Sequence, residues 1–254
     1  MSRNHPRSGS VIGLPWLALW YWFLAPAAVA EPALAAAPPP TFLEVANLAH
    51  YAEINAALPP PKPGEHRVVF IGDSITEGWR DADPQYFASA GSISRIDRGI
   101  GGQTSPQMLL RFQQDVIALH PYAVHILAGT NDVAGNWGAM PLEATERAIA
   151  SMAELAHAHG IRVLIGSVLP AREFPWRPGL NPGPAVLSLN GWLRAYSGSK
   201  GFIYVDYYAR LTDGELGMRP ELAADGVHPT PAGYALMKTL TDAAIQRALG
   251  SRVR

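Results

Sequence analysis

A serine that directly follows an apolar run is the first residue of this 254-residue sequence whose position suggests chemistry. The run from Val68 to Ile71 is apolar and mostly β-branched, and Gly72-Asp73-Ser74 follows it at once. Such a run is typical of a buried parallel strand, and open α/β sheets bind ligands beyond the carboxyl ends of their strands. Ser74 is therefore a candidate nucleophile. The alternative is that Asp73 and Ser74 only cap the next helix, as these residue types often do.

A serine hydroxyl needs a base within hydrogen-bond reach, and that base needs an orienting partner. His228 is the best candidate base, because it lies in a loop and has Asp225 three residues before it. This spacing lets the Asp225 carboxylate reach the far ring nitrogen of His228 and fix its tautomer. Of the other histidines, His125 lies inside an apolar strand and none has a comparable partner. The sequence thus favours Ser74, His228 and Asp225 as nucleophile, base and orienter.

Acyl transfer also needs hydrogen-bond donors for a developing oxyanion. Gly102, in the run from Gly99 to Thr104, can offer a backbone N–H with no Cβ to obstruct the substrate. Asn131, in Thr130-Asn131-Asp132, can offer a side-chain amide, and the Ser74 N–H is the third candidate donor. The ordinary alternatives are a loop turn for the glycines and a helix cap or Asx-turn for Asn131. Each of these alternatives is plausible for one cluster alone. It is less plausible that all of the clusters have such ordinary explanations at once.

Three further residues are candidates for contact with a substrate. Asp73 is adjacent to Ser74, which makes it a poor triad acid, and we expect it mainly to brace the loop. Trp137 follows the asparagine cluster, and Trp176 lies in the proline-rich loop 170–184, which is too long for a simple connector. Either indole could stack on a sugar or line an acyl pocket. The alternative is that both are packing aromatics.

Strand and helix patterns alternate along most of the chain. We expect strands at 68–71, 92–100, 122–128, 161–168 and 202–205, and helices at 41–58, 84–90, 106–119, 142–159, 186–197 and 231–249. This alternation implies right-handed crossovers and a parallel sheet with helices on both faces. The predicted fold is a three-layer α/β/α sandwich around a mainly parallel, about five-stranded sheet, of the flavodoxin-like type. The carboxyl ends of parallel strands share one edge, so the clusters at Ser74, Gly102 and Asn131 should converge there.

The N-terminal region resembles an export signal. Residues 1–30 combine a weakly basic start with an apolar core, and the small residues before Glu31 fit a cleavage site after Ala30, or alternatively within Ala33–Ala37. An uncleaved membrane anchor is the alternative, but the run is short and holds two prolines. We expect a Pro/Ala-rich linker and leading helix at 31–64, a catalytic domain at 65–250, a periplasmic or secreted location, and no stable membrane span after signal removal.

Composition excludes several classes of function. The formal net charge of −1 offers no basic excess for nucleic acid, and the absence of cysteine excludes disulfides and thiolate sites. There is no G-x-S-x-G or Walker A motif, and Thr104 breaks a dinucleotide-binding pattern. Asp132 and Asp225 with His228 could bind a metal, but their spacing does not demand one. No cofactor and no metal are therefore predicted.

The ordered blocks Gly72-Asp73-Ser74, Gly102, Gly129-Thr130-Asn131-Asp132 and Asp225-Gly226-Val227-His228-Pro229 resemble the SGNH hydrolases, also called GDSL esterases/lipases. The run Gly99 to Thr104 looks most like the branch of brain-type platelet-activating-factor acetylhydrolase catalytic subunits. The resemblance implies the same sandwich fold, Ser74, His228 and Asp225 as catalytic residues, and an oxyanion hole of Ser74, Gly102 and Asn131. It implies no cofactor.

The expected function is a secreted serine esterase for short, acetyl-type esters, including those of carbohydrates. Lysophospholipase, arylesterase or acyltransferase activity on the same fold is the alternative. A catalytically silent carbohydrate-binding protein is the alternative from another class. The oligomeric state is left open.

Overall fold

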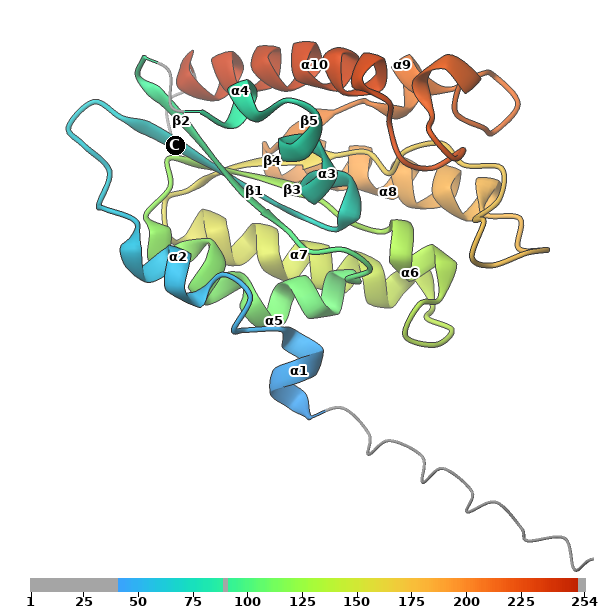
Figure 1. The fold of residues 1–254 in the computed structure, drawn as a ribbon, viewed down its shortest axis with the longest axis horizontal. Helices are drawn as coiled ribbons and strands as arrows, with labels where there is room; N and C mark the ends of the chain where they lie inside the picture. Colours follow the sequence, from blue (N-terminus) through green and yellow to red (C-terminus); the bar gives the residue numbers. More distant parts are fainter. Residues whose placement is uncertain (1–40, 89–90, 251–254) are drawn as a thin grey trace, which may run out of the picture. The chain divides into compact units, whose positions relative to one another are not determined.

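Five parallel strands form a single sheet, in the order β2-β1-β3-β4-β5 (Figure 1). The computed structural model describes residues 41–88 and 91–250, so the predicted signal peptide and its cleavage sites lie outside the described residues. The strands are β1 (His66–Gly72), β2 (Ile93–Gly99), β3 (Ala123–Leu127), β4 (Arg162–Gly166) and β5 (Ile203–Val205). Gly72 at the end of β1 pairs with Gly99 and with Leu127, so three strands end level with one another. The predicted parallel, five-stranded sheet is confirmed.

Helices cover both faces of this sheet (Figure 1). One face packs against α5 (Ser105–Asp115), α7 (Leu142–Ala158) and α8 (Gly183–Lys200), and the other against α3 (Ser74–Ala82), α4 (Pro84–Phe87), α9 (Tyr208–Leu211) and α10 (Pro231–Gly250). Alternation along β1 explains the two cores, because Val69 and Ile71 face the first layer while Val68 and Phe70 face the second. The predicted three-layer sandwich is confirmed. Short elements complete it: α6 (Thr130–Ala134), η1 (Ile117–Leu119) and η2 (Pro220–Leu222).

The expected single helix over 41–58 is wrong. The segment forms two short helices, α1 (Phe42–Ala46) and α2 (Ala52–Ala57). Asn47 adopts a left-handed conformation with φ of 51° and ends α1, which asparagine tolerates better than most residues. Tyr51 is then buried, and its hydroxyl donates to the Gly99 carbonyl at the end of β2 (2.5 Å). A tertiary contact, which helical spacing does not reveal, interrupts the helix.

The described helices give no sign of a membrane span. Within residues 41–88 and 91–250, none is both long and apolar enough to cross a bilayer.

Candidate active site

The turn from β1 into α3 presents Ser74 at the carboxyl edge of the sheet. Gly72 is required there by close packing, since a Cβ on it would lie 2.0 Å from Thr76 Oγ1 and 2.9 Å from the Leu127 carbonyl oxygen. Asp73 is the N-cap of α3, and its Oδ1 accepts from the Ile75 N–H (2.9 Å). Ser74 is the first residue of the helix and is partly exposed. The capping role considered for both residues therefore belongs to Asp73, and the Ser74 hydroxyl is left for another partner.

That partner is His228. Ser74 Oγ lies 2.9 Å from His228 Nε2, and His228 Nδ1 lies 2.8 Å from Asp225 Oδ2. The loop before α10 holds this arrangement, because Asp225 Oδ1 also accepts from the Val227 N–H (3.0 Å) and the His228 N–H (2.8 Å). With its proton on Nδ1 toward the carboxylate, the ring can accept the serine proton at Nε2. The structure thus brings the three residues together in the order that the sequence predicts.

Asp225 is expected to make stability depend on pH. Partial burial raises its pKa, but the hydrogen bonds from the His228 backbone and ring and from the Val227 N–H outweigh this and hold the pKa below its usual value. The folded-state pKa is then lower than the unfolded one, so the ionised group stabilises the fold at neutral pH, and this stabilisation is lost as the pH falls through the folded-state pKa.

We expect Asp225→Asn to be less stable than the wild type at neutral pH, with the difference shrinking below about pH 4. Urea unfolding of both proteins across this range measures the effect. A difference that stays constant, or that grows in acid, would contradict it.

The glycine loop after β2 runs beside the nucleophile. Gly102 has a φ of +75°, in the left-handed region that favours glycine. A Cβ built on Gly101 would lie 3.8 Å from Ser74 Cβ, and the Gly101 N–H donates to Glu77 Oε2 (2.9 Å). In the part of the chain that the structure describes, the N–H groups of Ser74 and Gly102 donate to no other protein group. Both remain available to a ligand.

Asn131 is buried, and its amide is held from both ends. Its Nδ2 donates to the Gln103 carbonyl (3.1 Å) and, at longer range, to Asp73 Oδ2 (3.3 Å). Its Oδ1 accepts from Asn136 Nδ2 (2.6 Å), and Asn136 Oδ1 in turn accepts from Trp176 Nε1 (2.9 Å). The series Trp176–Asn136–Asn131 therefore directs the Asn131 N–H groups toward the nucleophile turn and the glycine loop.

Asn136 was not predicted from the sequence. A polar residue between Gly135 and Trp137, just after the asparagine cluster, is the only local signal for it.

The two predicted aromatic contacts lie in different surroundings. Trp176 is 39% exposed, stacks on Phe174, and has its ring centroid 6.1 Å from that of His228. Trp137 is 54% exposed and lines a cavity of about 180 Å³ together with Gly101 and Gly102. Both indoles are therefore beside candidate catalytic groups, one near the base and one near the glycine loop.

Two buried carboxylates brace the site. Asp73 is 1% exposed, and burial raises its pKa to about 7, although the Ile75 N–H and the nearby His228 oppose the shift. Its burial supports the bracing role over substrate contact. Asp132 accepts from the Ser105 N–H and hydroxyl and from the Thr145 hydroxyl, which ties α6 to the start of α5 and to α7. Among the described residues, no group of three or more His, Asp or Glu could hold a metal ion.

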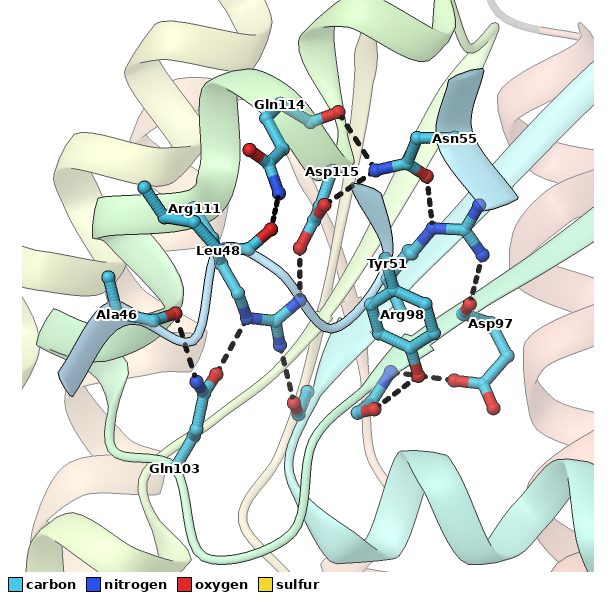
Figure 2. Close-up of polar contacts among 12 residues, drawn as sticks. Ala46, Leu48, Tyr51, Asn55, Asp97, Arg98, Gln103, Arg111, Gln114 and Asp115 are labelled. Atoms are coloured by element: carbon cyan, nitrogen blue, oxygen red, sulfur yellow. Dashed lines mark hydrogen bonds and ion pairs between the residues drawn. The ribbon is translucent and has the colours of Figure 1, made fainter. Parts of the chain in front are cut away.

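A buried arginine connects the nucleophile turn to the glycine loop (Figure 2). Arg111 of α5 is fully buried; its Nη2 donates to the Gly72 carbonyl (3.0 Å) and its Nε to Gln103 Oε1 (2.6 Å). Its charge is paired with Asp115 at 3.0 Å. Gly72 precedes Asp73 and Gln103 follows Gly102, so one guanidinium holds the nucleophile turn through its backbone and the glycine loop through the Gln103 side chain. The local sequence signal for Arg111 is an Arg–Asp pair at i, i+4 in a helix that also buries Phe112.

Comparisons with known proteins show the family to which this fold belongs. The model of the GDSL-like lipase/acylhydrolase family matches residues 70–236. A GDSL-like lipase from Bacteroides thetaiotaomicron VPI-5482 is 48% identical, with a TM-score of 0.78, over 81% of this chain and 100% of that one. An acylhydrolase candidate from Bacteroides fragilis NCTC 9343 is 47% identical, with a TM-score of 0.77, over 80% and 98%.

The uncharacterized lipoprotein YqeF of Bacillus subtilis (strain 168) is 32% identical over 124 residues, or 43% of this chain. The match spans about half of that relative, 51% of its length. None of these similarities tests the finer resemblance to the platelet-activating-factor acetylhydrolase branch, which stays a prediction.

Proposed function

Because the chain belongs to the GDSL-like lipase/acylhydrolase family, we propose that it is a serine ester hydrolase that acts through an acyl-enzyme on Ser74. The observation that carries this proposal is the hydrogen-bonded series Ser74–His228–Asp225 at the carboxyl edge of the sheet. Open α/β sheets bind their ligands at this edge. The proposal assigns the roles of nucleophile, base and orienting carboxylate to these three residues.

The reaction follows from these positions. Ser74 Oγ attacks the ester carbonyl carbon while its proton passes to His228 Nε2, and Asp225 stabilises the imidazolium that forms. His228 then gives the proton to the departing alkoxide. The alcohol departs, and the acyl group stays bonded to Ser74 Oγ. Water attacks this acyl-enzyme with His228 again as base. The carboxylic acid is released and the serine is restored.

The oxyanion that forms in each step has three donors nearby. Within residues 41–88 and 91–250 the N–H groups of Ser74 and Gly102 have no other acceptor and can bind it. The Ser74 N–H also lies in the first turn of α3, where the helix dipole favours negative charge. The Asn131 amide becomes the third donor when one of its N–H groups exchanges its long bond to Asp73 Oδ2 (3.3 Å) for the oxyanion. The pKa of Asp73, which burial raises to about 7, limits the negative charge next to this site.

Asn136 is proposed as the residue that orients this third donor. Replacing it by aspartate keeps the shape but removes the N–H that donates to Asn131 Oδ1, since a carboxylate only accepts. We expect Asn136→Asp to lower kcat by about 10²–10³, the usual effect of losing one oxyanion donor, with little change in KM. Steady-state kinetics on p-nitrophenyl acetate measures both constants.

Asn181→Asp is the matched control, because Asn181 is exposed in the same proline-rich loop as Trp176. It should leave kcat unchanged. A wild-type kcat in Asn136→Asp would remove Asn136 from the mechanism.

For the substrate, we propose short acyl esters, with acetyl groups on carbohydrates among them. The exposed Trp176 ring near His228 supports a leaving group with a flat apolar face, such as a sugar ring.

For the location, we propose the periplasm or the medium. The similarity to a protein named as a lipoprotein supports a place outside the cytoplasm.

The direct test is the reaction of the folded protein with a fluorophosphonate probe, followed by peptide mapping. The proposal requires that the probe modify Ser74 and that the protein hydrolyse p-nitrophenyl acetate. A folded protein that shows neither reaction would be the catalytically silent binding protein instead.

A further inference from the structure

The cavity of about 180 Å³ beside the glycine loop is walled partly by a segment outside the family match. Val45 and Asn47, at the end of α1, line one part of it, and Gly102 and Trp137 line another. The family model begins only at residue 70. The leading segment, expected from the sequence to be a linker and a helix outside the sheet, therefore reaches the neighbourhood of the candidate oxyanion donors.

The position of His228 indicates which part of an ester would enter this cavity. The base must deliver its proton to the leaving oxygen, so the alcohol part of the substrate lies on the His228 side, where Trp176 also lies. Neither of these residues lines the cavity, whereas Gly102, a candidate donor to the carbonyl oxygen, does. The ester carbonyl carbon carries the alcohol part and the acyl chain. Because the alcohol part lies on the His228 side, the acyl chain is the part that would enter the cavity.

The chemistry of the walls agrees with this direction, because most polar side chains that line the cavity already have partners: Glu44 accepts from the Thr41 N–H (2.7 Å), and the amides of Gln103 and Gln107 are also occupied, which leaves Asn47. Gln103 donates to the Ala46 carbonyl (3.4 Å) and accepts from Arg111 (2.6 Å). Gln107 donates to the Val45 carbonyl (3.0 Å) and accepts from the Thr104 N–H (2.9 Å). Each hydroxyl of a sugar would need its own partner, and leaving it unpaired is costly.

Apart from Asn47 and the backbone of Gly101 and Gly102, the lining surface that remains is apolar, from Val45, Ile100 and Trp137. A hydrocarbon chain needs only such contact. The volume of about 180 Å³ also lies below the roughly 300–1,000 Å³ of sites for drug-sized ligands, which favours a short chain.

The wall is held in place by the buried network of Figure 2. Glutamines of the glycine loop and of α5 donate to backbone carbonyls of the leading segment: Gln107 to Val45, Gln103 to Ala46, and Gln114 to Leu48. Asn55 of α2 adds a bond to Asp115 (2.7 Å), the partner of Arg111. The same guanidinium that holds the nucleophile turn thus anchors the segment that walls the cavity.

The geometry points to an acyl pocket built by residues 44–47 and Trp137, in which the leading segment sets the acyl chain length that the enzyme accepts. This inference rests on the proposed esterase function. It adds to that function a specificity role for a segment that precedes the matched family domain.

The test is the chain-length profile of kcat/KM on p-nitrophenyl esters from acetate to octanoate. Val45→Trp fills the cavity and should lower the ratio of butyrate or hexanoate to acetate by about 10-fold or more, since one methylene in an apolar pocket is worth about 10–200-fold. Trp137→Ala enlarges the cavity and should shift the profile toward longer chains. Ile54→Trp is the matched control, because Ile54 is exposed on α2 and does not line the cavity.

Each result of this experiment either supports or overturns the acyl pocket. Opposite shifts in the two pocket variants, with an unchanged control, support the acyl pocket. An unchanged acyl profile in Trp137→Ala overturns it, even if Val45→Trp fails to fold. The two substrates acetylated xylan and p-nitrophenyl acetate carry the same acyl group and differ only in the alcohol. If the pocket variants change only the ratio of activity on these two substrates, and not the acyl-chain profile, the acyl pocket is also overturned. Failure of the esterase proposal looks different: the wild type then hydrolyses no ester and its Ser74 takes no fluorophosphonate label.

Discussion

Replacing Ser74 by alanine is expected to abolish ester hydrolysis and leave the fold intact. In the proposed mechanism this hydroxyl, 2.9 Å from His228 Nε2, is the atom that His228 activates and that carries the acyl group. Loss of a triad serine typically lowers kcat on the order of 10⁶-fold, because the members of a triad act as a unit. Ser74 is partly exposed at the first position of α3, so alanine leaves no buried cavity and no missing cap. Hydrolysis of p-nitrophenyl acetate measures the loss.

Two controls separate this loss from damage to the fold. Ser151→Ala, at an exposed position of α7, should keep wild-type kcat. Ser74→Ala should keep the far-UV circular dichroism and thermal midpoint of the wild type and should lose the fluorophosphonate label. A folded Ser74→Ala protein with wild-type turnover would show that another residue is the nucleophile.

Replacing Arg111 by methionine is expected to have the largest effect on stability. Arg111 and Asp115 are both buried, and removing one partner of a buried ion pair costs about 3–5 kcal/mol because the other charge is left uncompensated. The Gly72 carbonyl and Gln103 Oε1 would also lose a donor. Urea unfolding gives the change in the free energy of unfolding.

The matched control is Arg172→Met. Arg172 pairs with Asp213 and Glu215 at the surface, where ion pairs contribute about 0–1 kcal/mol. The double variant Arg111→Met/Asp115→Leu should recover part of the loss, since it removes the unpaired charge as well. If Arg111→Met were no more destabilising than Arg172→Met, the buried network would not be what holds the nucleophile turn and the leading segment together.

The candidate site was predictable from the sequence where its chemistry is local. Asp225 and His228 are three residues apart, so their pairing follows from spacing within one turn. Ser74, Gly102 and Asn131 each follow an apolar run that reads as a strand, and the parallel sheet brings strand ends to one edge. Hydrophobic alternation and helical spacing report which side of an element is buried, which is why the layers of the sandwich could be anticipated in outline.

Contacts between distant segments were not predictable in the same way. Asn136 and Arg111 are polar residues whose partners come from other elements, and a pattern along the chain reports burial but not the identity of a partner. The break of the 41–58 helix has the same origin, because Tyr51 turns inward to reach Gly99 rather than following the helical repeat.

The chain by itself therefore determined the chemical types, their order and the edge at which they meet. Only the tertiary structure decided the rest, since Ser74 and His228 are 154 residues apart and become partners only when the sheet and the loop before α10 are packed. The same packing directs the Asn131 amide through Asn136 and Trp176, and it places the leading segment beside the glycine loop. Directional hydrogen bonds between such segments depend on three-dimensional geometry, which a one-dimensional pattern of burial does not encode.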